Sequence, residues 1–151
     1  MNIYMDVCCL NRPFDDQTQD RIYIESEAVL KILFNCQNGI WSLIGSDIID
    51  FEIRKISDPD KYENVYILST LTSNKVKYND EIKRRALQLR EYGLGLFDSI
   101  HIASAEYAKV NIMLTTDDKL INKAKIIKDI SLRIENPVHW LMEVTSNENN
   151  F

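Results

Sequence analysis

The chain has 151 residues, a length typical of one globular domain and too short for two well-developed ones. Its apolar content of 45% and charged content of 27% are ordinary for a folded protein, which excludes a disordered or fibrous chain. The 18 basic and 23 acidic residues give a net charge of −5. This balance is poor for gripping a phosphate backbone, so a nucleic-acid ligand would need a local basic patch or a cation that neutralises the acids.

The first residues and the cysteines indicate where the protein works. No run approaches about 18 apolar residues, and the first residues include an acid, so we expect neither a membrane span nor a signal peptide. The three cysteines show no zinc-site spacing, and we expect small, reduced, mostly buried thiols. The sequence therefore predicts a cytoplasmic protein without a membrane partner.

The apolar pattern predicts strands that alternate with helices, and the scarcity of Gly (4) and Pro (3) disfavours a turn-rich all-β fold. In chain order we expect a strand at 2–7, a helix at 18–37, a strand at 40–45, helices at 47–56, 59–72, 79–92 and 97–110, a strand at 111–116, a helix at 117–126 and a strand at 131–135. Strands separated by helices need crossover connections, which indicates an α/β fold with a mostly parallel sheet and helices on both faces. One domain is expected over 1–144, followed by a polar C-terminal tail over 145–151.

Two acids stand where parallel strands end. Asp6 follows the first predicted strand and Asp117 follows the strand at 111–116, so both would project over the same edge of the sheet. Asp117 is also a natural helix cap, a role for which Asp118 competes. That explanation is weaker for Asp6, because no helix is expected directly after it.

Two further acids fall on apolar helix faces. Glu52 lies within the stripe that contains Ile49 and Ile56, and Asp98 shares a helical line with Ile102. An isolated buried carboxylate costs several kcal/mol unless it is paired or bound to a cation. The alternatives are that Glu52 reaches water from the edge of its stripe and that Asp98 is a first-turn acid favoured by the helix dipole.

Four carboxylates in one pocket need a counter-charge, since even one pair about 4 Å apart repels by about 4 kcal/mol at an effective dielectric near 20. A divalent cation supplies that charge. Oxygen ligands without cysteine or a histidine pair favour Mg²⁺ or Mn²⁺ over zinc. Such a site suits metal-assisted hydrolysis of a phosphodiester.

The motifs IYMDVCCLNRPF, SDIIDFE, GLGLFDSIHIASA and LTTDDKL together resemble those of PIN-domain nucleases along almost the whole chain. The matching acids are Asp6, Glu52 (six residues after Ser46), Asp98 and Asp117 of the Thr-x-Asp element. The resemblance implies a three-layer α/β/α sandwich and a Mg²⁺- or Mn²⁺-dependent endoribonuclease acting on single-stranded RNA. It also implies a homodimer and, as in many small members, the toxin of a toxin–antitoxin pair with an antitoxin protein as partner.

The resemblance also assigns roles. Asp6 and Asp98 would be direct metal ligands, Glu52 and Asp117 would act directly or through water, and Thr115 would orient Asp117. His101 is in reach of Asp98 and is a candidate to orient a carboxylate or contact substrate, although a satisfied, partly buried histidine is the commoner outcome. Many members have Ser, Thr or Asn shortly after the first Asp. Here that stretch holds Cys8 and Cys9, with Asn11 as a supporting candidate further on.

The basic residues that suggest RNA contact lie mainly on the predicted helix at 79–92. Lys83, Arg84 and Arg90 lie off its packing face, where a solvated surface is the default interpretation and guidance of RNA phosphates is the alternative. Arg12, in the loop after Asp6, is a separate candidate for a phosphate contact.

Other functions remain open at this stage. A non-catalytic PIN-like module that binds RNA or protein without cutting is the main alternative to the nuclease. A receiver-like phosphoacceptor domain and a DxD-type phosphotransferase are disfavoured, because the segment after Asp6 lacks the second acid that both need.

Overall fold

Five parallel strands form one sheet with the order β3-β2-β1-β4-β5. The structure, a computed structural model, describes residues 1–149. The strands are β1 (Asn2–Met5), β2 (Ser42–Ser46), β3 (Asn74–Val76), β4 (Ile112–Leu114) and β5 (Ile134–Glu135). The expected α/β fold with a parallel sheet is confirmed, and the sheet is parallel throughout.

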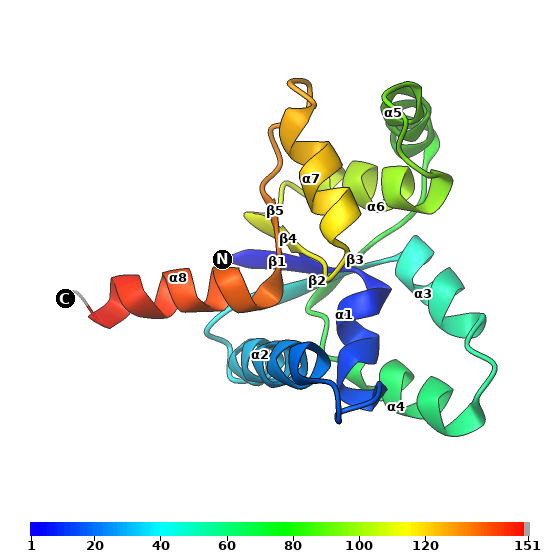
Figure 1. Ribbon diagram of the computed structural model, residues 1–151. Helices are drawn as coiled ribbons and strands as arrows, with labels where there is room; N and C mark the ends of the chain where they lie inside the picture. The colour runs from blue at the N-terminus through cyan, green and yellow to red at the C-terminus, as the bar shows by residue number, and fades with distance from the viewer. Residues whose placement is uncertain (150–151) are drawn as a thin grey trace.

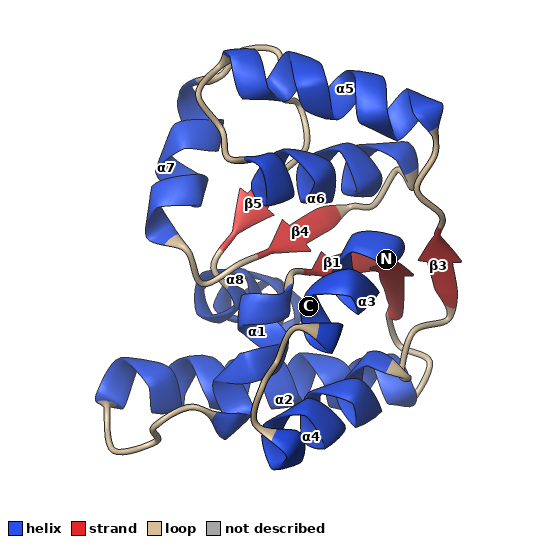
Figure 2. Ribbon diagram, turned by 90° about the vertical axis from the view of Figure 1, so that its right-hand side faces the viewer, coloured by secondary structure: helices blue, strands red, loops and turns tan. Residues whose placement is uncertain are grey.

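Helices cover both faces of this sheet (Figures 1 and 2). They are α1 (Val7–Asn11), the short 3-10 helix η1 (Arg12–Phe14), α2 (Asp20–Gln37), α3 (Asp47–Arg54), α4 (Pro59–Ser69), α5 (Asp80–Glu91), α6 (Leu96–Tyr107), α7 (Asp118–Ile126) and α8 (Pro137–Asn149). In Figure 1, α2 and α4 lie on one side of the sheet and α5, α6 and α7 on the other. The result is the three-layer α/β/α sandwich that the family resemblance implies. None of the helices described is long and apolar enough to cross a membrane.

The central strands explain why the core lies at the sheet. Ile3, Tyr4 and Met5 of β1 are almost completely buried, as are the three residues of β4 beside it. Strands with helices on both faces bury side chains on both sides, so they are continuous apolar runs rather than alternating patterns. The residues directly after β1 and β4 therefore lie near the middle of the edge that the carboxyl ends of the strands form.

The structure corrects the predicted elements in three places. Val7 belongs to helix α1 rather than to the first strand, so a helix does begin directly after Asp6. Strand β3 is short, polar and half exposed, and its sequence NKV carries no apolar pattern that would have predicted it. The C-terminal helix α8 was also missed.

Helix α8 replaces much of the expected polar tail. Its Trp140 is buried against Trp41, with the ring centroids 4.9 Å apart, and the helix packs along α2. It continues through residues 145–149, where the sequence predicted the tail. Residues 150 and 151 of that predicted tail lie outside the described residues.

Candidate functional site

Asp6 lies at the carboxyl end of β1 and is only 7% exposed. Its side chain caps helix α1, because Oδ1 accepts a hydrogen bond from the backbone N–H of Cys9 at 3.3 Å. The Cys8 thiol also donates to Oδ1, with Sγ and Oδ1 2.6 Å apart. Burial raises the pKa of Asp6 well above its usual value, and the neighbouring Cys8 raises it further. The hydrogen bonds to Asp6 thus do not fully offset the cost of burying its negative charge.

Asp117 follows β4 and caps helix α7. Its Oδ1 accepts hydrogen bonds from the backbone N–H groups of Lys119 at 3.0 Å and Leu120 at 3.2 Å. The cap is therefore Asp117 and not Asp118. The Thr115 hydroxyl accepts a hydrogen bond from the backbone N–H of Asp117 at 3.1 Å, so Thr115 holds the main chain of Asp117 rather than its carboxylate. The second carboxylate oxygen of Asp117 is outside the capping interaction.

Glu52 comes from helix α3 and is held by His101 from helix α6. The His101 side chain is 3% exposed, and its Nε2 is hydrogen-bonded to Oε1 of Glu52. Its Nδ1 is 2.6 Å from the Tyr4 hydroxyl, which is in turn 2.8 Å from the Ser46 hydroxyl. A chain of hydrogen bonds through two strands (β1 and β2) and two helices (α6 and α3) therefore fixes the position of the half-buried Glu52.

Ser46 links this chain to the start of α3. Its hydroxyl accepts a hydrogen bond from the backbone N–H of Ile49 and so caps helix α3. The role of Tyr4 was missed from the sequence, where an aromatic residue in a buried strand is taken as core. The available signal was its hydroxyl, because a buried Tyr O–H needs a hydrogen-bond partner.

Asp98 stands in the first turn of α6 and is half-buried. Burial raises its pKa, and the negative charges of Asp117 and Glu52 raise it further, while His101 and Lys123 act in the opposite direction. These mutual effects mean that Asp98 lies within electrostatic reach of both other carboxylates. Helix α3, helix α6 and the β4–α7 junction thus each contribute one acid to an electrostatically coupled group, although among the described residues no three of the four acids have carboxylate oxygens within 4.8 Å of one another.

The charges of this acidic edge (Asp6, Glu52, Asp98 and Asp117) are not balanced by basic side chains. In the described part of the chain, no Lys or Arg forms an ion pair with any of the four, and the only ion-pair partner is His101 on Glu52. Carboxylate oxygens are the ligands that hard divalent cations prefer. The donor set and its uncompensated charge therefore fit a divalent cation.

Sulfur is part of the same site. Among residues 1–149, the one group of three or more acidic, Cys or His residues with ligand atoms within 4.8 Å of one another is Asp6, Cys8 and Cys9. Hydrogen bonding lowers the pKa of the Cys8 thiol to about 6, with Cys9 the largest cause and Asp6, Thr115 and Thr116 adding to it. Burial raises the pKa of Cys9. Sequence reasoning treated both cysteines as small apolar side chains and missed the contact between Cys8 and Asp6.

Asn11 and Arg12 lie away from the acidic edge. Asn11 is the last residue of α1, at the opposite end of that helix from Asp6. The Arg12 guanidinium forms ion pairs with Glu25 at 2.9 Å and Asp15 at 3.1 Å, so its charge is already neutralised within the protein.

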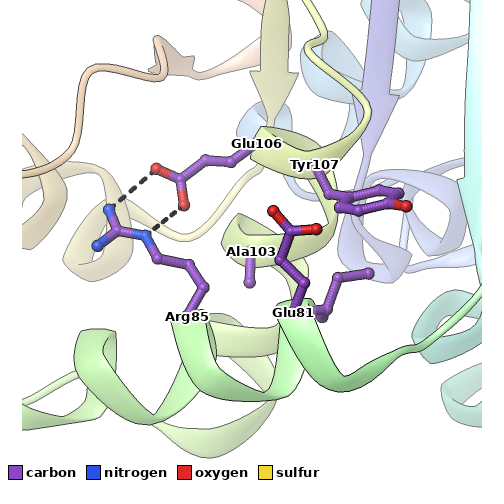
Figure 3. A pocket seen from close by; sticks show the side chains of 6 residues that line it. Glu81, Arg85, Ala103, Glu106 and Tyr107 are labelled. Atoms are coloured by element: carbon purple, nitrogen blue, oxygen red, sulfur yellow. Dashed lines mark hydrogen bonds and ion pairs between the residues drawn. The ribbon is translucent and has the colours of Figure 1, made fainter.

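The basic residues predicted on helix α5 are exposed. Lys83, Arg84 and Arg90 all lie on its solvent side. Arg85 differs from them, because it pairs with Glu106 at 2.7 Å across a cavity of about 220 Å³ between α5 and α6 (Figure 3). None of the four acids lines that cavity. The Arg85 and Glu106 side chains in its wall neutralise each other.

Comparison with known proteins gives one match by sequence. The family model of the PIN domain matches residues 4–126, which include all four acids. A search of curated protein sequences finds no significant match.

Solved structures are similar in fold at low sequence identity. VapBC2 from Rickettsia felis bound to a DNA fragment from their promoter is 14% identical, with a TM-score of 0.59 over 90% of this chain and 98% of that one. VapBC-1 from nontypeable Haemophilus influenzae is 16% identical, with a TM-score of 0.57 over 91% and 98%. PAE2754 from Pyrobaculum aerophilum is 14% identical, with a TM-score of 0.55 over 97% and 90%. At these identities the similarity shows the fold alone.

Proposed function

Because the chain belongs to the PIN domain family, we propose that it is a divalent-cation-dependent endoribonuclease that hydrolyses phosphodiester bonds of single-stranded RNA. The observation that carries the proposal is the acidic edge. Asp6 and Asp117 follow neighbouring parallel strands, Asp98 is electrostatically coupled to Asp117 and Glu52, and no Lys or Arg in the described residues pairs with any of the four.

The acids would hold Mg²⁺ or Mn²⁺, with Asp6 and Asp98 as direct ligands and Glu52 and Asp117 acting directly or through water. A divalent cation bound there supplies Lewis acidity, which activates water and stabilises the charge that develops in phosphodiester hydrolysis. His101 orients Glu52 through their hydrogen bond. Thr115 fixes the backbone at Asp117.

RNA would reach this edge with help from the exposed face of α5. Lys83, Arg84 and Arg90 are solvent-exposed. Contacts from these side chains to phosphates would carry no sequence information. Arg12 is a poorer candidate than the sequence suggested, since phosphate would have to compete with Glu25 and Asp15 for its guanidinium.

We further propose that the protein is the toxin of a toxin–antitoxin pair, with an antitoxin protein as its partner and a homodimer as its assembled form. The structural similarity to two VapBC proteins, over 90% or more of this chain, supports the antitoxin partner. The homodimer is proposed from the family resemblance alone.

The test is cleavage of a fluorescent single-stranded RNA in Mn²⁺ or Mg²⁺, with EDTA as the blank. We expect Asp6→Asn and Asp117→Asn to lower the cleavage rate by at least about a hundredfold, because even indirect supports of a metal site cost 10- to 100-fold. Asp118→Asn is the matched control, since this adjacent acid pairs with Arg21 at 2.7 Å instead of belonging to the acidic edge.

Two results would contradict the nuclease. RNA that is retained without metal-dependent products would favour the non-catalytic binding module. Cleavage that survives unchanged in Asp6→Asn would mean that the activity does not arise at this site.

A further inference from the structure

Cys8 brings a sulfur atom to a site otherwise made of oxygens. Its Sγ lies 2.6 Å from Oδ1 of Asp6, and the ligand atoms of Asp6, Cys8 and Cys9 all lie within 4.8 Å of one another. A cation held by the Asp6 carboxylate is therefore within reach of the Cys8 sulfur.

Contacts from a second strand end hold the Cys8 sulfur beside the Asp6 carboxylate. The backbone N–H of Thr116 donates a hydrogen bond to Sγ at 3.3 Å, and the Thr115 hydroxyl is 3.4 Å from it. Both contacts come from the segment after β4, which is the segment that carries Asp117. They hold the Cys8 side chain between the ends of the two central strands. The position of the sulfur is therefore fixed by contacts with a separate element of the fold.

We propose that Cys8 is a thiolate ligand of the divalent cation at this site, so that the protein binds a softer first-row ion such as Zn²⁺ or Co²⁺ in preference to Mg²⁺. This inference rests on the cation site of the proposed function. Thiolates are soft ligands that favour zinc and related ions, whereas Mg²⁺ selects oxygen and water. Coordination releases the thiol proton to solvent, as it does for every Cys ligand.

The probe is Co²⁺, whose thiolate complexes absorb in the near ultraviolet by sulfur-to-metal charge transfer. We expect the reduced, metal-free wild-type protein to develop this band on titration and to saturate at one thiolate-bound ion per chain. Cys8→Ser is expected to lose the band while it keeps the weaker visible absorption of Co²⁺ bound through oxygen. Cys36→Ser is the matched control, because Cys36 lies on α2 outside the Asp6–Cys8–Cys9 group, and it should keep the band.

Affinities give a second readout that does not depend on activity. We expect the Zn²⁺ affinity of Cys8→Ser, measured by calorimetry, to fall by at least about tenfold, since even indirect supports of a metal site cost that much. The Mg²⁺ affinity should stay within about twofold, because a hydroxyl replaces the thiol with a hard donor. Far-UV circular dichroism of each variant checks that the chain remains folded.

The outcomes distinguish a failure of the thiolate ligand from a failure of the proposed nuclease function. Wild type that binds Co²⁺ without the charge-transfer band, or a band that survives in Cys8→Ser, overturns the thiolate ligand even if RNA is still cleaved. A band that disappears in Cys8→Ser supports it, even if no RNA is cleaved and the proposed nuclease fails. Absence of any Co²⁺ binding overturns both.

Discussion

Two buried carboxylates in this protein have opposite electrostatic surroundings. Glu25 on α2 is 2% exposed and is bound by Arg12 at 2.9 Å, Arg21 at 3.3 Å and the amide of Asn136 at 2.6 Å. Asp6 at the end of β1 is 7% exposed, and within residues 1–149 its carboxylate accepts hydrogen bonds from a thiol and a backbone N–H. The two side chains are similarly buried, but only one has its charge neutralised by the protein itself.

The difference distinguishes a structural acid from a functional one. A buried charge that is paired and fully hydrogen-bonded is tolerated as part of the fold, whereas an unpaired one shifts its pKa or requires a counter-ion from outside. Arg12 shows the consequence for sequence reasoning. Its position near Asp6 suggested a phosphate contact, but its charge is used to neutralise Glu25.

The largest stability effect is expected at Glu25. Glu25→Gln should lower the free energy of unfolding by about 3 kcal/mol, the scale for removing one partner of a buried ion pair. Urea denaturation in metal-free buffer measures it. Glu52→Gln is the matched control and should change stability much less, because Glu52 is half-buried and bonded only to His101. An equal loss of unfolding free energy in the two variants would contradict the assignment of Glu25 as the structural acid.

The next effect is stabilisation by a cation at the acidic edge. Mn²⁺ at 100 times its dissociation constant should raise the free energy of unfolding by about 2.7 kcal/mol. The melting temperature should then rise by about 5–10 °C, at 2–4 °C per kcal/mol. We expect Asp6→Asn to abolish this rise and Glu25→Gln to retain it. An equal rise in both variants would place the cation elsewhere.

A smaller effect is expected from pH in the metal-free protein. Burial raises the pKa values of Asp6 and Asp98 in the folded state, so the folded chain binds protons more tightly than the unfolded one. Their stabilisation is complete below the unfolded carboxyl pKa of about 3.9 and is lost as the pH rises through the raised values.

Thermal melts at several pH values in EDTA measure this dependence. Asp98→Asn removes one titrating group and should flatten the fall in stability with rising pH. Asp118→Asn is the control and should leave that fall in place, because pairing with Arg21 lowers the pKa of Asp118 instead of raising it. If stability falls with rising pH at the same slope in Asp98→Asn, the pKa of the Asp98 carboxyl is not raised in the folded state.

The smallest effect concerns the exposed face of α5. Lys83→Ala should weaken binding of single-stranded RNA uniformly across sequences and reduce the slope of log affinity against log salt by about 0.7. Fluorescence anisotropy in metal-free buffer measures it without cleavage. Arg85→Ala on the same helix is the control and should leave the slope unchanged, since Arg85 is already paired with Glu106 and Asp129.

Much of the fold was predictable because local patterns determine it. The apolar runs at β1, β2 and β4 located the central strands. Strand β3 and helix α8 were not predictable in the same way. The former has a polar sequence, and the latter depends on the packing of Trp140 against Trp41, about a hundred residues away.

Local sequence patterns were enough to predict the α/β fold, the family resemblance and the four acids at strand ends or on apolar helix faces. The partners of the polar side chains became known from the folded chain: His101 binds Glu52, Arg12 binds Glu25, and Cys8 binds Asp6. The physical reason is that helix and strand periodicity fixes the face on which a side chain lies, whereas its partner is set by how separate elements pack. Whether a buried charge is neutralised depends on that partner, so the acidic edge became distinguishable from the Glu25 pairs only in the folded chain.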